Sequence, residues 1–161
     1  MKMRFCFWGG TAARRSESAS MADWCVFCPI ARRDPTSNTV LLYSDDRVVA
    51  FQDINPSASR HYLVIPIEHI PTVNNLQKSR EHHQLVSHMV KVGKDLLNRD
   101  APNSEEHRFG FHQPPFNSID HLHLHCQALP FMPSWRQVKY TPLARLGGFV
   151  DAESLLEVIK P

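Results

Sequence analysis

Three histidines stand at every second position of the chain, at His121, His123 and His125, and leucines separate them. A period of two is the period of a β-strand, so a strand here would present the imidazoles on one face and the leucines on the other. Imidazole is a common ligand of Zn²⁺. It is also a competent nucleophile and proton carrier near neutral pH. The pattern therefore predicts a metal site, a site of nucleophilic chemistry, or both, and leaves these alternatives open.

Two further residues could bind different parts of a phosphorylated ligand beside these rings. Ser118 ends a loop with two prolines, three residues ahead of His121, and such a loop can aim a hydroxyl and backbone N–H groups at an anion. Asp53 follows an apolar run, where a carboxylate can accept hydrogen bonds from ribose hydroxyls, and Ile54 beside it offers an apolar surface to a base. Taken alone, each of these residues also suits an ordinary turn.

A second candidate site starts at Cys25-x-x-Cys28, which has the spacing of a zinc ligand pair. Two ligands do not make a site, and no second pair of this kind follows. Any further ligands would be histidines, of which the chain has ten. Two buried thiols without a metal are the alternative interpretation.

The hydrophobic pattern predicts a mixed fold. We predict strands over 40–43, 48–51, 61–66, 107–111 and the histidine segment 119–129, a long amphipathic helix from about Glu81 to Arg99, and short helices near Pro29 and over 152–160. We predict irregular structure over 131–148, with a turn at Gly147-Gly148. This order lacks the βαβ alternation of a parallel sheet, so we expect an α+β fold with an antiparallel sheet.

Length, composition and charge indicate how many domains the chain forms and which kinds of partner it lacks. The 161 residues, 42% of them hydrophobic, fit one globular domain over 21–161, whose last part, 131–161, forms a C-terminal tail. Residues 1–20 are basic and rich in serine and alanine, so we expect a disordered extension, with a targeting segment as the alternative. A net charge of +2 gives no case for nucleic acid, and no apolar run predicts a membrane span. We expect a cytoplasmic protein with reduced cysteines; the peroxisome or another organelle is the alternative.

Together these residues resemble the histidine triad family of nucleotide-binding hydrolases and transferases. The family signature alternates three histidines with apolar residues, and HLHLHCQ at 121–127 is similar to it, with a glutamine in the last position. Further similar segments are CVFC at 25–28, AFQDI at 50–54, HYLVIP at 61–66 and EHI at 68–70. The run FGFHQPPFNS at 109–118 resembles the branch of third-type Hint proteins and aprataxin, and with the tail it looks most like plant Hint proteins described as adenylylsulfatases.

The resemblance implies a mechanism. His123 matches the family nucleophile, which attacks the α-phosphorus of an adenosine 5′-phosphate derivative and forms a covalent AMP-histidine. Water then releases AMP, and phosphate in its place gives ADP. The implied catalytic residues are His123, His125, Ser118 and His61, and the implied nucleotide-binding residues are Asp53, Ile54, Phe27, Ile30, His112, Asn117, Ser118, His123 and His125.

The resemblance also implies a cofactor and an assembly. In metal-binding members, the zinc ligands match Cys25, Cys28, His69 and His121, which would leave the other two triad histidines to the phosphate. The implied fold is a five-stranded antiparallel sheet with two main helices. Two protomers would form a homodimer with a ten-stranded sheet.

Three functions remain open at this point. The first is an enzyme that cleaves adenosine 5′-phosphosulfate or adenosine 5′-phosphoramidate through the covalent intermediate. The second is a zinc hydrolase that uses all three histidines on a catalytic metal. The third is a nucleotide-binding regulator whose turnover is incidental. DNA repair of the aprataxin kind is not favoured, because no basic stretch or further zinc module follows.

Overall fold

The structure is a computed structural model, and it describes residues 24–142 and 148–161. The extension predicted over 1–20 therefore lies outside the described residues, as does Gly147 of the predicted turn. The strands are β1 (Leu41–Ser44), β2 (Val48–Gln52), β3 (Ala58–Pro66), β4 (His107–His112), β5 (Leu124–Phe131) and β6 (Phe149–Asp151). The α-helices are α1 (Phe27–Ala31), α2 (Arg80–Asp100) and α3 (Ala152–Val158), and 3-10 turns lie at η2 (Pro35–Ser37), η3 (Val73–Asn75) and η4 (Ser134–Tyr140).

All strands in the described part of the chain form one sheet in the order β1-β2-β3-β5-β4-β6. Every neighbouring pair is antiparallel. The α+β fold with an antiparallel sheet is thus confirmed. None of the helices in the described residues has the length and apolar character needed to cross a membrane.

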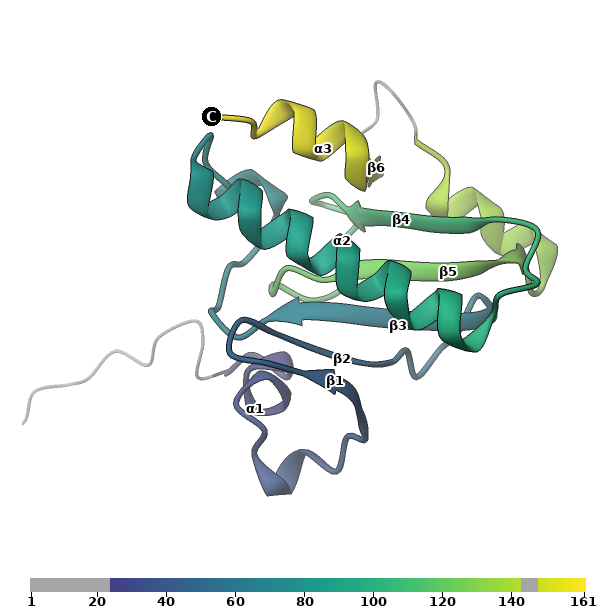
Figure 1. Cartoon of the computed structure of the whole chain (residues 1–161), viewed down its shortest axis with the longest axis horizontal. Coiled ribbons are helices and arrows are strands. Elements are labelled where there is room, and N and C mark those ends of the chain that lie inside the picture. The colour runs from purple at the N-terminus through teal and green to yellow at the C-terminus, as the bar shows by residue number, and fades with distance from the viewer. Residues whose placement is uncertain (1–23, 143–147) are drawn as a thin grey trace, which may run out of the picture.

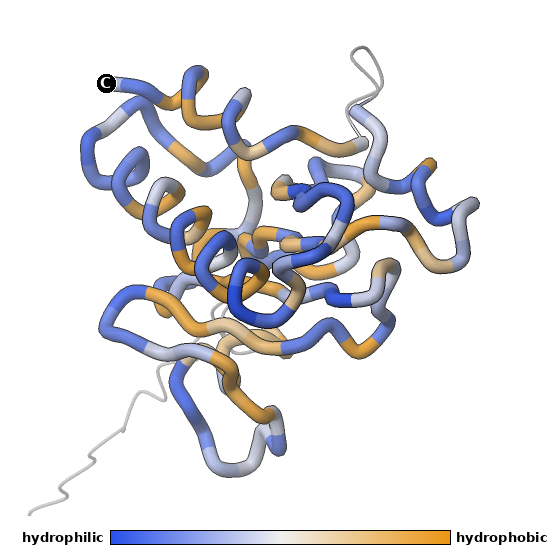
Figure 2. Tube along the Cα trace, turned by 45° about the vertical axis from the view of Figure 1, so that its right-hand side comes forward, coloured by the Kyte–Doolittle hydropathy of each residue, from blue (hydrophilic) through white to orange (hydrophobic). Residues whose placement is uncertain are grey.

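Helix α2 lies across one face of the sheet (Figure 1). Its predicted stripe of Leu85, Met89, Val92 and Leu96 is buried, and the stripe belongs to the same core as Val64 of β3. Hydrophobic and hydrophilic stretches alternate along the helix (Figure 2), as expected when one side packs on a sheet and the other meets water. This core fixes the strands that carry the histidines.

The opposite face of the sheet carries α1 together with His61, His112 and His125. Neighbouring residues of a strand point to opposite faces, so in β3 His61 and Leu63 share this face while Val64 packs under α2. Helix α1 covers part of it, with the Phe27 ring edge-on to Phe51 at 5.5 Å between centroids. The rest of the face is left for the site.

The prediction of one strand with all three histidines is wrong in part. Strand β5 begins at Leu124, so only His125 lies in it, and His121 and His123 lie in the irregular segment before it. In the β3–β5 register Val64 pairs with Leu124, and β3 ends at Pro66, which has no N–H to continue the ladder. The segment before β5 is therefore free to turn its side chains in different directions.

The C-terminal segment differs most from expectation. The segment predicted as irregular contains the 3-10 turn η4. Strand β6 pairs with β4 and is the sixth strand in the described residues, whereas the resemblance implied five. Helix α3 follows directly and packs beside α2 (Figure 1). A strand of three residues is too short to show an alternating pattern in the sequence, which explains why it was not predicted.

Gly110 of β4 offers a test of this packing. A Cβ there would lie 2.5 Å from Val150 O and would collide with the Phe149 ring. We expect Gly110→Ala to lower the free energy of unfolding by about 1–3 kcal/mol, measured by urea denaturation. Gly148→Ala is the control, because its Cβ would meet only Phe116, at 3.9 Å. Equal stability of the two variants would contradict the described packing of β6.

Candidate active site and metal centre

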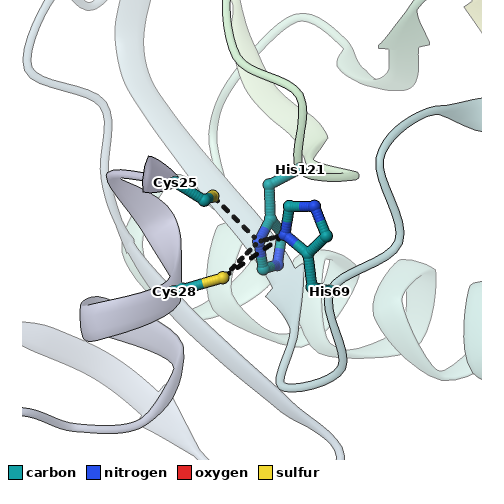
Figure 3. A group of neighbouring side chains, drawn as sticks. All are labelled: Cys25, Cys28, His69 and His121. Carbon is teal, nitrogen blue, oxygen red and sulfur yellow. Dashed lines mark hydrogen bonds between the residues drawn. The ribbon is translucent and has the colours of Figure 1, made fainter. Parts of the chain in front are cut away.

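Two clusters of side chains lie next to each other at the start of β5. In the first cluster, Cys25 comes from the turn before α1 and Cys28 from α1 itself, while His69 comes from the loop after β3 and His121 from the segment before β5 (Figure 3). His121 Nδ1 lies 3.4 Å from Cys25 Sγ and 3.7 Å from Cys28 Sγ. His69 Nδ1 lies 3.3 Å from Cys28 Sγ and 3.3 Å from His121 Nδ1. The four residues implied as metal ligands are thus brought together.

The donor set fits a tetrahedral metal ion. With Zn–N near 2.0–2.1 Å and Zn–S near 2.3 Å, the edges of such a tetrahedron are about 3.3–3.8 Å, which matches these spacings. His121 Nε2 donates to the Pro66 carbonyl at 2.9 Å, so the lone pair of the neutral ring is on Nδ1, toward the two sulfurs. The cluster is therefore able to hold a metal.

The second cluster is a chain of three imidazoles with one direction of hydrogen bonding. Ser57 N–H donates to His61 Nδ1 at 3.1 Å, so the proton of the neutral His61 ring lies on Nε2. His61 Nε2 then donates to His125 Nδ1 at 2.9 Å. His125 Nε2 donates to His112 Nδ1 at 2.9 Å, and His112 Nε2 donates to the Lys139 carbonyl at 3.0 Å. A backbone donor at one end and a backbone acceptor at the other fix every tautomer.

His123 lies beside this chain with a different partner. Its Nδ1 donates to the carbonyl of His121 at 2.6 Å, which leaves the lone pair of the neutral ring on Nε2. The ring is 6% exposed and packs edge-on against Phe27, with centroids 5.5 Å apart. An imidazole held in this way has one nitrogen available for nucleophilic attack.

A cleft of about 780 Å³ opens onto these rings. Of the residues predicted for catalysis or nucleotide binding, the cleft is lined by Phe27, Ile30, Asp53, Ile54, His112, Ser118, His123 and His125. The Asp53 carboxylate is half-buried, and its Oδ1 accepts from Asn55 N at 2.8 Å. Ile54 is fully exposed at the cleft, as an apolar contact for a planar ligand would be.

Two predicted residues lie elsewhere than the cleft wall. His61 is completely buried behind His125, so it acts on the site through that ring rather than by touching a ligand. The Asn117 side chain turns away, and its amide donates to Asp120 Oδ1 at 2.8 Å. Ser118 is exposed at the cleft.

No pattern in the sequence indicated the part that η4 takes in the site. Arg136 Nη1 donates to Asn55 O at 3.2 Å, Asn55 Oδ1 at 2.9 Å and Pro56 O at 3.0 Å, and so holds the loop after Asp53. The buried ring of Tyr140 packs on all three imidazoles of the chain, with centroids 5.1–5.7 Å apart. The contacts of η4 with the loop after Asp53 and with His61 join residues about 80 positions apart, so no local pattern could have revealed them.

Burial keeps the imidazoles of the chain neutral. It lowers the pKa of His61 to about 4, although the Asp53 carboxylate opposes the shift. It also lowers the pKa of His112 and, further, that of His125, where neighbouring rings add to the effect. Burial lowers the pKa of His123 as well, while its hydrogen bond to the His121 carbonyl opposes the change. Neutral rings are the form that nucleophilic chemistry requires.

Comparison with known proteins identifies the family. Residues 24–141 match the family model described as scavenger mRNA decapping enzyme C-terminal binding. The bifunctional adenosine 5′-phosphosulfate phosphorylase/adenylylsulfatase HINT4 of Arabidopsis thaliana is 63% identical over 137 residues, which are 85% of this chain and 92% of that protein. This chain belongs to the histidine triad family.

Other members of the histidine triad family agree with this assignment. The adenosine 5′-monophosphoramidase HINT3 of Xenopus tropicalis is 43% identical over 74% of this chain and 75% of its own length. The solved structure of a HIT family hydrolase from Clostridium thermocellum has a TM-score of 0.60 and 28% identity, over 67% of this chain and 92% of that one. The resemblance to the Hint branch is thus confirmed, as is the family fold.

The neutral imidazole chain makes stability depend on pH. His61 stays neutral in the folded protein down to about pH 4, whereas in the unfolded chain it takes up a proton near pH 6.5. The unfolded state then binds more protons, so we expect the free energy of unfolding to decrease as the pH falls from 6.5 to about 4. A shift of this size corresponds to a loss on the order of 3 kcal/mol.

Urea denaturation of the wild type and of His61→Asn at pH 7.5 and pH 5 checks this expectation. The variant should lose less stability between the two pH values, because one buried imidazole is gone. His83→Gln on α2 is the control and should behave like the wild type. An identical loss in His61→Asn and the wild type would contradict the assigned neutral state of His61.

Proposed function

We propose that this protein is a nucleotide hydrolase and nucleotidyltransferase that cleaves conjugates of AMP through a covalent AMP-histidine on His123. The observation that carries the proposal is the hydrogen bond of 2.6 Å from His123 Nδ1 to the His121 carbonyl. It leaves Nε2 as the unprotonated nitrogen of a ring that lines the cleft. The relatives named above act on adenosine 5′-phosphosulfate and on adenosine 5′-phosphoramidates, which supports the same substrate class here.

The reaction proceeds in two displacements on the α-phosphorus. His123 Nε2 forms a bond to phosphorus, and the bond to the leaving group breaks, with its electron pair going to that group. Water or phosphate then attacks the same phosphorus and releases His123, giving AMP or ADP. His125, whose ring centroid lies 5.0 Å from that of His123, shares its Nε2 proton between His112 Nδ1 and a phosphate oxygen, and Ser118 assists the leaving group. These are roles of hydrogen-bond donors at a developing charge.

The nucleoside binds in the part of the cleft that Asp53 lines. Asp53 accepts hydrogen bonds from the ribose hydroxyls, and the half-buried carboxylate is held by its own loop for this role. Phe27, Ile30 and Ile54 supply apolar contacts for the base. The turned-away amide of Asn117 gives no support to a direct nucleotide contact from that residue.

His123→Ala tests the proposed nucleophile. We expect kcat with adenosine 5′-phosphosulfate and with adenosine 5′-phosphoramidate to fall about a thousandfold or more, because no other group replaces the attacking nitrogen. AMP binding, measured by calorimetry, should change little. Acid-quenched wild type should carry an AMP adduct, by mass spectrometry, that the variant lacks. His83→Ala is the control, and substantial turnover by His123→Ala would refute the mechanism.

We further propose that the metal of the Cys25, Cys28, His69 and His121 cluster is a structural zinc ion. A set of two thiolates and two imidazoles is typical of closed structural zinc sites. The ion would join α1 to the segment before β5. The use of His121 in this cluster supports a nucleophilic role for the other triad histidines over a catalytic metal bound by all three.

Zinc content tests this proposal directly. The purified wild type should contain about one zinc ion per chain by mass spectrometry of the metal, as expected for one four-ligand site. Cys25→Ser should lose the zinc, and a chelator should lower the unfolding temperature of the wild type but not of this variant. Cys126→Ala, outside the cluster, is the control and should keep the zinc. Equal metal content in all three proteins would contradict the site.

Assembly and location remain predictions for this protein. A homodimer that extends the sheet would have to use β1 or β6, because these are the edge strands in the described residues. Sedimentation equilibrium decides between monomer and dimer. The single domain over 21–161 and the cytoplasmic location, with the peroxisome or another organelle as alternative, likewise stay predictions.

A further inference from the structure

The two charged residues in the wall of the cleft have opposite signs. Among the described residues that line it, Asp53 is the only acid and Lys139 is the only lysine or arginine. The Asp53 carboxylate lies 3.5 Å from His61 Nε2, at one end of the imidazole chain, whereas Lys139 adjoins His112 at the other end. The acid and the lysine of the cleft wall therefore stand beside opposite ends of the chain of three imidazoles.

The backbone of Lys139 is held firmly beside the reacting rings. Its carbonyl accepts the last hydrogen bond of the imidazole chain from His112 Nε2, at 3.0 Å. The next residue, Tyr140, is buried and hydrogen-bonded through its hydroxyl to Ser57 Oγ at 3.1 Å. The position of the Lys139 backbone in the cleft wall is thus fixed, and its side chain starts from this fixed point.

The Lys139 ammonium group has no partner in the described part of the chain. No hydrogen bond or ion pair joins its Nζ to any of the described residues, whereas Lys91, Lys94 and Lys160 each face a carboxylate. Burial lowers the pKa of His112, the hydrogen bond to the Lys139 carbonyl opposes this change, and His123 and the positive charge of Lys139 each add to the lowering. An exposed cation that nothing neutralises, at the wall of a cleft, is suited to bind an anion.

We propose that Lys139 is a specificity-determining residue that forms an oxyanion subsite for the sulfate leaving adenosine 5′-phosphosulfate and for the phosphate that replaces it. The inference rests on the proposed function and extends it to the choice of leaving group. The group that attacks the AMP-histidine enters from the side that the first leaving group has vacated. One cation therefore serves both anions.

The balance of protons explains why a fixed charge suits these two anions. When His123 Nε2 attacks, the bond between phosphorus and the sulfate oxygen breaks, and sulfate departs with the electron pair as a dianion that needs no proton. In the second step an oxygen of hydrogen phosphate attacks phosphorus and His123 departs. The proton of hydrogen phosphate stays on the new β-phosphate of ADP. Neither step consumes a proton, so stabilisation comes from positive charge.

The leaving group of adenosine 5′-phosphoramidate needs a different kind of stabilisation from the same part of the cleft. This leaving group is an amine, which requires a proton and departs without negative charge. A proton donor assists this departure, whereas the charge of Lys139 has no anion to stabilise there. Removing the charge should therefore change the preference between the two substrates.

Steady-state kinetics of Lys139→Gln and Lys139→Arg test the inference. We expect Lys139→Gln to lower kcat/KM for adenosine 5′-phosphosulfate about tenfold relative to kcat/KM for adenosine 5′-phosphoramidate. The KM for phosphate in ADP formation and the inhibition constant of sulfate should both rise. Lys139→Arg keeps the charge and should stay near the wild-type ratio. Lys91→Gln, on the exposed side of α2, is the control for loss of a surface lysine.

The outcomes separate this inference from the function on which it rests. A wild type that cleaves neither AMP conjugate overturns the proposed function itself. If the wild type is active but Lys139→Gln keeps the wild-type ratio, the oxyanion subsite is overturned and the function stands. An equal loss on both substrates also overturns it, because such a loss indicates a general disturbance of η4 or of His112.

Discussion

The short hydrogen bond from His123 Nδ1 to the His121 carbonyl is the interaction on which the site depends. It sets the tautomer of the proposed nucleophile, and it makes His121 a member of both clusters. The His121 ring faces Cys25 and Cys28, while its backbone faces His123. A metal held by that ring would also hold the carbonyl in place. The metal centre would then act on the reaction by positioning, without contact with the substrate.

This arrangement requires a segment that is not a strand. In a regular strand inside the sheet, the carbonyl of His121 would pair with a neighbouring strand. It would then not be available to the ring of His123, two residues later. Pro66 ends β3 opposite this point, and the Leu122 N–H pairs with Ile70 O at 2.6 Å. Leu122 and Leu124 still enter the core under α2, as an alternating segment would. The chain thus keeps the alternation of leucines while it turns the histidines apart.

Much of the fold and of the site was predictable from the sequence. The parts that were not predictable depend on contacts made only in the folded chain. The long helix, the hairpin and the antiparallel sheet could be predicted from periodicity. An element that buries one face repeats hydrophobic residues at its own period, and this repeat is visible within a short stretch of sequence. The ligand set with Cys25 and His69 came from the family resemblance, and the described atoms lie at distances that a metal would require. Asn117 turns away from the cleft because Asp120 nearby offers it an acceptor. The contributions of Arg136 and Tyr140 depend on contacts between segments far apart in the chain, which neither spacing nor composition encodes.

The imidazole chain that begins at Ser57 N–H and ends at the Lys139 carbonyl works in one direction only. No ring in it can rotate by half a turn unless the other two do so as well, and the two backbone groups at its ends cannot reverse at all. The orientation of His125 is therefore set through its two ring nitrogens, by the entry to β3 at Nδ1 and by η4 at Nε2. A redesign of this site that replaces one imidazole would have to keep an acceptor toward Ser57 and a donor toward Lys139, whatever side chain is chosen.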